Sequence, residues 1–178
     1  MKKLIILAML ALPVIATAQE IVGNTYKGDD HIVITDKEIC RSFTDRMVLS
    51  VGLSGLKVED RSFYFLDLKI TSSDKITMGA GDYLTLWLKG GETIKLPATD
   101  GNTDGMVRDI HSVNGFITHD FSAYPSFEIS AEQLDAISAK GVEKIQCNTS
   151  PNMYVKEFKK DKIGKAIVAR WALLKKEL

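Results

Sequence analysis

The sequence holds little of what several protein classes need. It has two cysteines and four prolines in 178 residues, and its basic and acidic side chains number 23 each. So few cysteines exclude a disulfide-dense miniprotein, and so little proline excludes a collagen-like chain. Because the charges balance, there is no electrostatic case for a nucleic-acid partner. With 45% apolar and 26% charged residues, the composition is that of an ordinary globular domain with a real core.

A long apolar run occurs only at the N-terminus. A basic start precedes apolar residues 4–15 and the small-residue triplet Ala-Thr-Ala that ends at Ala18. This order is typical of a secretory signal peptide and is too short for a membrane span. We expect cleavage of residues 1–18, which leaves a soluble periplasmic or secreted protein without an integral membrane segment. No cysteine lies nearer the cleavage site than Cys40, so we do not expect a lipoprotein.

Charge is spread unevenly over the remaining chain. Residues 154–178 hold eight basic and three acidic side chains, whereas residues 19–153 hold 13 and 20. A basic tail of this kind can serve membranes or anionic partners. The same segment also carries an apolar face at helical spacing, which favours a cationic helix that packs against an acidic body.

Most of residues 19–178 alternate between apolar and polar side chains, the spacing of half-buried β-strands. The pattern is clearest in residues 47–53, 64–70 and 84–88. The pair Gly90 and Gly91 predicts a tight hairpin to residues 92–96, because glycine accepts positive φ. Successive short strands without intervening helices predict an antiparallel sheet or sandwich.

Two helices are expected late in the chain, at about 130–140 and 161–177. Ser130 and Gln133 form the sequence pattern of a capping box, and Asp161 is placed to cap the second helix. The apolar face of the second helix comprises Ile163, Ile167, Trp171 and Leu174. The sequence therefore predicts a β-rich α+β fold, as a single domain over residues 19–178 because no repeat or linker interrupts it.

Two segments and the closing helix resemble a known group of proteins. The segments are YLTLWLKGGETIKL at 83–96 and FEISAEQL at 127–134, the latter leading to GVEKI at 141–145. With the lysine-rich final helix they are similar to small exported proteins of Bacteroidetes-type bacteria whose role is uncharacterised. The resemblance covers about residues 62–176 and implies export and a β-rich fold.

Catalytic patterns are sparse. The run GLSGL around Ser54 approaches a nucleophile elbow, but its second glycine comes one residue early and it lies in an alternating strand. Ser54 is therefore interpreted as a strand-end or turn residue. A Cys–His dyad with Cys40 or Cys147 stays open, because such pairs meet in space and not in sequence. None of the histidines forms the helical pair of a zinc site; they are His31, His111 and His119.

The two cysteines also allow a structural hypothesis. Cys40 and Cys147 are the only cysteines of a chain expected in an oxidising compartment, which predicts one disulfide between them. Two reduced, buried thiols are the alternative.

Residues 100–105 read DGNTDG, the first half of a calcium loop. Oxygen ligands from Asp100, Asn102 and Asp104 would converge on the ion. The twelfth position is His111 instead of the bidentate glutamate, and Asp, Asn and Gly are also the residues that turns select. We retain calcium as a hypothesis against an ordinary polar loop, and expect no other cofactor.

The function class follows mainly from this lack of a convergent catalytic set. We expect an exported, non-enzymatic binding or interaction module, with a protein or a glycan as possible ligand. A small extracytoplasmic hydrolase is the first alternative, and an envelope-associated structural protein that uses the basic C-terminal segment is the second. Phe158 is the only aromatic residue among the lysines of 156–165, which favours a solvated face over a nucleic-acid groove.

Overall fold

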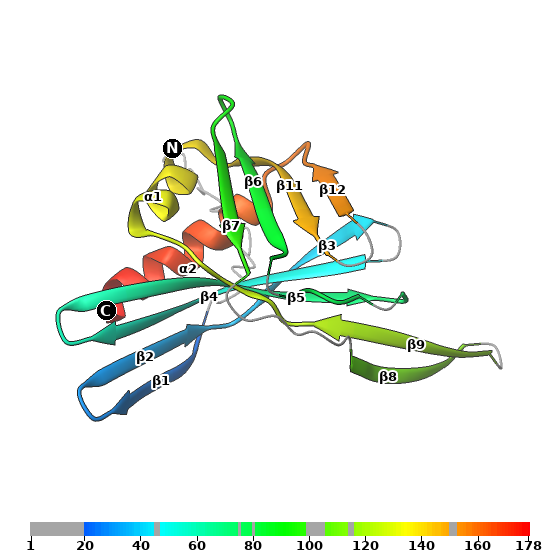
Figure 1. Cartoon of the computed structure of the whole chain (residues 1–178), viewed down its shortest axis with the longest axis horizontal. Helices are drawn as coiled ribbons and strands as arrows, with labels where there is room; N and C mark the ends of the chain where they lie inside the picture. The colour runs from blue at the N-terminus through cyan, green and yellow to red at the C-terminus, as the bar shows by residue number, and fades with distance from the viewer. Residues whose placement is uncertain are drawn as a thin grey trace, which may run out of the picture.

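The computed structural model describes residues 20–44, 47–74, 76–79, 81–98, 106–113, 116–149 and 153–178. Within these ranges the chain forms twelve strands and two helices, and every strand pair is antiparallel (Figure 1). The β-rich α+β fold expected from the sequence is confirmed.

Eight strands form the larger sheet. Its main path runs in the order β1 (Ile21–Lys27), β2 (Asp30–Thr35), β4 (Met47–Val58), β5 (Arg61–Ser72), β9 (Phe116–Ala123) and β8 (Met106–Val113). Two short strands pair off this path: β3 (Glu38–Thr44) with β4, and β10 (Ser126–Glu128) with β5. Because β2 and β3 both pair with β4, through different parts of its length, the chain bends between them at residues 36–37.

Four strands form the smaller sheet, in the order β12 (Met153–Glu157), β11 (Val142–Asn148), β6 (Tyr83–Leu88) and β7 (Thr93–Pro97). The expected hairpin joins β6 to β7, and its glycines have φ of 97° at Gly90 and 89° at Gly91. These angles are strained for residues with a side chain, which is why glycine occupies both positions.

The helices are α1 (Ala131–Lys140) and α2 (Ile163–Glu177), within two residues of the predicted limits. Both halves of the capping box are made, since Ser130 Oγ accepts from Gln133 N and Gln133 Oε1 accepts from Ser130 N. Asp161 also caps as expected, because its Oδ1 accepts a 2.7 Å hydrogen bond from Gly164 N. None of the helices in the described residues is long and apolar enough to cross a membrane.

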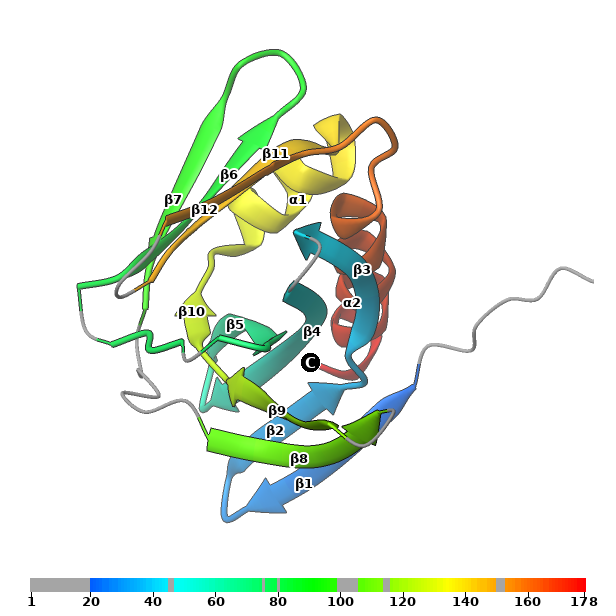
Figure 2. The same ribbon diagram turned by 90° about the vertical axis from the view of Figure 1, so that its right-hand side faces the viewer.

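One hydrophobic cluster contains residues of both sheets and both helices. Figure 2 shows α1 beside the smaller sheet, and α2 alongside β3 and β4. Trp171 of α2 is 3% exposed and meets Tyr64 of β5 edge-on, with the ring centroids 4.8 Å apart. The last helix is therefore a core element, as its apolar face predicted.

A buried arginine joins α2 to the bend between β2 and β3. Arg170 is 1% exposed, and its Nε donates to the carbonyl oxygen of Asp36 at 2.8 Å. Its two terminal nitrogens donate to the carboxylates of Asp36 and Glu38, each at 2.9 Å. These bonds compensate the buried charge and hold the start of β3 against the helix.

Candidate functional site

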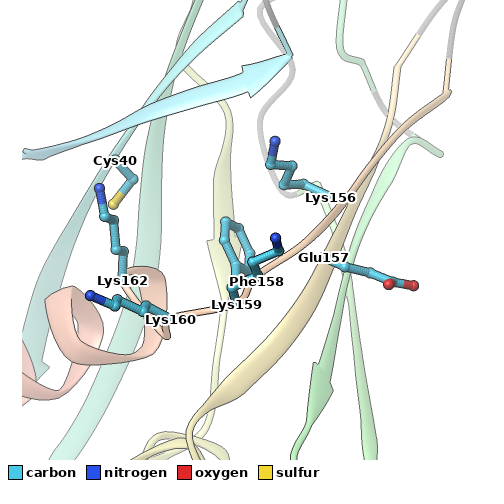
Figure 3. Close-up of a pocket in the computed structure, with 7 residues that line it drawn as sticks. All are labelled: Cys40, Lys156, Glu157, Phe158, Lys159, Lys160 and Lys162. Carbon is cyan, nitrogen blue, oxygen red and sulfur yellow. The ribbon is translucent and has the colours of Figure 1, made fainter.

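A hollow of about 400 Å³ lies between β3 and the segment that connects β12 to α2 (Figure 3). We call it the lysine hollow. Its size falls in the range of small-molecule sites. The lining residues are Cys40, Lys156, Glu157, Phe158, Lys159, Lys160 and Lys162.

Strand alternation directs part of the lining inward. In β12, Tyr154 pairs with Cys147 and Lys156 pairs with Ile145, so Lys156 lies on the side of the sheet that faces the core. Phe158 follows on the same side, and its backbone N donates to the carbonyl oxygen of Glu143 at 2.8 Å. Phe158 is half-buried and packs against the core cluster, so its ring forms part of an anchored wall.

The far end of this segment is fixed by Asp161. Its carboxylate accepts from Gly164 N at 2.7 Å and from Val142 N at 3.0 Å, which ties the start of α2 to the start of β11. The turn that carries Lys159, Lys160 and Lys162 is thus held between β12 and a capped helix. All three of these lysines are exposed.

Carboxylates lie near the lysine hollow, since the charges of Glu38 and Asp161 both act on the Cys40 thiol that lines it. No carboxylate within the described residues pairs with any of its four lysines. Glu157 is the one acidic residue among the described lining residues, and Figure 3 shows its carboxylate directed away from the others. It lies 3.8 Å from Lys144 on the neighbouring strand instead. Four lysines therefore line one concavity, and none of them has a counter-ion among the described residues.

Cys40 forms the opposite wall. It is 5% exposed, and burial, followed by the charge of Glu38, raises the pKa of its thiol to about 11. Arg170 and Lys162 oppose this shift without cancelling it. The thiol is therefore protonated at neutral pH, and it adds a neutral, weakly polar surface and not a nucleophile.

The disulfide expected between Cys40 and Cys147 is absent, which corrects that prediction. Both residues are buried free cysteines, on β3 of the larger sheet and on β11 of the smaller sheet. Cys147 is 1% exposed, and burial raises the pKa of its thiol to about 12. Both thiols are buried and free, so the alternative of two reduced thiols describes this structure.

Of the other residues singled out in the sequence, the described side chains Ser54 and His31 do not assemble into a catalytic set, and a Cys–His dyad with His111 or His119 is not tested. Ser54 lies inside the continuous strand β4, paired with Ile34 and Phe65, so the strand-to-helix turn of a nucleophile elbow is not formed there. His31 is buried; its Nε2 lies 2.7 Å from Asn24 Oδ1 and its ring stacks on Tyr26 at 4.1 Å. The side chains of His111 and His119 lie outside the described part of the structure.

The calcium hypothesis is not tested, because Asp100, Asn102 and Asp104 lie outside the described residues. Among the residues that are described, no group of three or more His, Cys, Asp or Glu side chains is arranged to hold a metal ion.

The lysine hollow itself was not anticipated from the sequence. The solvated-face interpretation treated the lysines of 156–165 as one surface, whereas four of them surround a concavity and Lys165 lines no part of it. The sequence held one signal for the hollow. Lys156 and Phe158 both lie on the same face of the alternating segment 154–158, so a lysine shares a face with an apolar residue. Nothing in the local pattern indicated that β3 would supply the facing wall.

No protein-family model, curated protein sequence or solved structure matches the chain, so its function has to be argued from this geometry.

Proposed function

We propose that the protein is an exported, non-enzymatic binding module that holds an anionic ligand in the lysine hollow. The observation that carries the proposal is the set of four lysines around one concavity, none paired with a carboxylate of the described residues. Like charges placed together repel and lower stability, and a bound anion removes that cost.

Three lysines outside the hollow have a carboxylate nearby. Lys140 pairs with Glu92, Lys144 lies near Glu157, and Lys175 pairs with Asp135. Other described lysines, such as Lys165 and Lys176 of α2, have no carboxylate partner either, so the four of the hollow differ in that they line one concavity. The described lining residues also include no histidine that would serve as a general base.

The two alternative functions have weaker support. A hydrolase that used Cys40 would need a thiolate, but burial keeps this thiol protonated. An envelope-associated structural role would use the basic C-terminal segment as a free surface, yet Arg170 and Lys175 of that segment are engaged with Asp36, Glu38 and Asp135.

The test is a calorimetric titration of the purified exported protein with naphthalene trisulfonate. We expect binding that weakens as salt is raised and that falls about tenfold in the double variant Lys156→Gln, Lys162→Gln. The matched control is Lys165→Gln, Lys176→Gln, which removes the same charge from exposed positions of α2 outside the hollow. No detectable binding, or equal weakening in the control, would contradict the proposal.

A further inference from the structure

The size and the lining residues of the lysine hollow indicate more about its ligand than that the ligand is negatively charged. A water molecule takes up roughly 30 Å³, and a tetrahedral oxyanion with its five heavy atoms takes up a small multiple of that. The hollow measures about 400 Å³, so phosphate or sulfate would leave most of it unfilled. A ligand that fits must carry an organic body together with its charge.

The wall chemistry indicates that this body is apolar. Phe158 is anchored against the core, and the protonated thiol of Cys40 faces it from β3. The four lysines also add the apolar stems of their side chains to the lining, because only the terminal ammonium needs water. An aromatic or alicyclic body can pack between the phenyl ring and these stems.

The distribution of charge indicates more than one anionic group. A monoanion could pair with only one of the four lysines that line the hollow, whereas a polyanion could pair with several. The lysines also belong to two different segments (Figure 3). Lys156 lies on β12, whereas the turn before α2 carries Lys159, Lys160 and Lys162. A lysine ammonium is a point charge on a flexible stem, whereas an arginine guanidinium is a planar fork that matches one carboxylate. A site built from lysines therefore discriminates between ligands by their number of anionic groups more than by the geometry of any one group.

The geometry points to an amphiphilic polyanion as the ligand: a compact apolar body, aromatic or alicyclic, that carries at least two phosphate, sulfate or carboxylate groups. This inference rests on the proposed function, since it requires the lysine hollow to be the binding site. Both walls are held in place without ligand, by Arg170 at the start of β3 and by Asp161 at the start of α2. The site is accordingly preorganised for a compact soluble molecule.

The experiment compares four probes on the purified exported protein by calorimetry and competition. They are inorganic sulfate, naphthalene monosulfonate, naphthalene trisulfonate, and vesicles of phosphatidylglycerol with phosphatidylcholine. We expect the trisulfonate to bind about tenfold more tightly than the monosulfonate, and by at least that factor more tightly than sulfate. We also expect the trisulfonate to slow alkylation of Cys40, mapped by mass spectrometry, because Cys40 lines the hollow.

The other outcomes show whether the amphiphilic polyanion alone is wrong or whether the lysine hollow binds no anion at all. Equal affinity for the monosulfonate and trisulfonate would overturn the requirement for several charges and leave anion binding intact. Equal affinity for sulfate and trisulfonate would overturn the apolar body. Vesicle binding that the trisulfonate does not displace would overturn the soluble ligand in favour of a lipid surface. Failure of every anion would remove the proposed function itself.

A variant of the apolar wall adds a second readout. Phe158→Leu keeps an apolar side chain but loses the ring, and circular dichroism establishes whether the fold is retained. We expect trisulfonate binding to weaken about three- to tenfold while sulfate binding is unchanged. If both probes weakened equally, the ring would have no role toward the organic body and that part of the inference would be wrong.

Discussion

The indole N–H of Trp171 donates a 2.7 Å hydrogen bond to Asp135 Oδ1, and this contact joins α2 to α1. The same oxygen accepts from Lys175 Nζ at 3.1 Å. A buried aromatic ring of the core and an exposed cation of the surface are thus linked through one carboxylate.

Asp135 should make part of the stability depend on acid. The bond from Trp171, and then that from Lys175, hold the pKa of the Asp135 carboxyl below its ordinary value of 3.8. When the pKa of a carboxyl group is lower in the folded state than in the unfolded state, its ionised form stabilises the fold. This stabilisation is complete at a pH above the pKa of the unfolded state, and it is lost as the pH falls through the pKa of the folded state. Asp135→Asn should therefore be less stable at neutral pH, yet lose less stability than the wild type as the pH falls below 3.8. Chemical denaturation across this range tests it; parallel acid profiles would contradict it.

Trp171 should contribute to the stability of the whole fold. The side chain is 3% exposed and contacts Tyr64, so Trp171→Ala leaves a large cavity between α2 and the larger sheet. We expect a loss of about 3–5 kcal/mol in the free energy of unfolding, measured in urea. Trp171→Phe is the matched control; it keeps an aromatic ring and should cost clearly less. Equal stability of the alanine variant and the wild type would show that α2 is not part of the core.

Gly164 should not tolerate a side chain. A methyl group there would lie 2.8 Å from Asp161 Cγ and nearer still to both carboxylate oxygens. Asp161 cannot move away without losing its bonds to Gly164 N and Val142 N. We expect Gly164→Ala to cost about 1–3 kcal/mol. Gly23→Ala serves as control, because a methyl group there meets Ile34 at an ordinary 3.4 Å; equal melting temperatures for the two variants would contradict the prediction.

The two cysteines should remain reduced and react slowly. With thiol pKa values of about 11 for Cys40 and about 12 for Cys147, about one molecule in ten thousand or fewer carries a thiolate at neutral pH. We expect slow alkylation by iodoacetamide in the native state, with Cys40 ahead of Cys147, and rapid alkylation of both in denaturant. A non-reducing peptide map that contained a peptide linking Cys40 to Cys147 would show instead that the disulfide forms.

Export should remove residues 1–18. This prediction depends on the apolar run and on the small-residue triplet that ends at Ala18. N-terminal sequencing of the exported protein should therefore begin at Gln19. Recovery of the uncleaved chain from the membrane fraction would contradict it.

The fold was predictable to the extent that it depends on neighbouring residues. Alternation in residues 47–53, 64–70 and 84–88 predicted three strands, because the face on which a strand residue lies depends on whether its position is odd or even. Gly90 with Gly91 predicted the β6–β7 hairpin, and Ser130 with Gln133 predicted the start of α1. These signals act over two to four residues, which is why the sequence alone contains them.

The site depends on contacts that no local pattern contains. The lysine hollow exists because β3 meets the β12–α2 connection, more than 110 residues later in the chain. Arg170 belongs to a lysine-rich helix, yet tertiary packing buries it against Asp36 and Glu38. Cys40 shares a strand face with Glu38, which favours exposure, but the side chain is 5% exposed because the β12–α2 connection lies opposite it. Alternation and capping in the sequence determined the strands and helices. The packing of the apolar faces of two sheets and two helices around one core decided that β3 faces the β12–α2 connection.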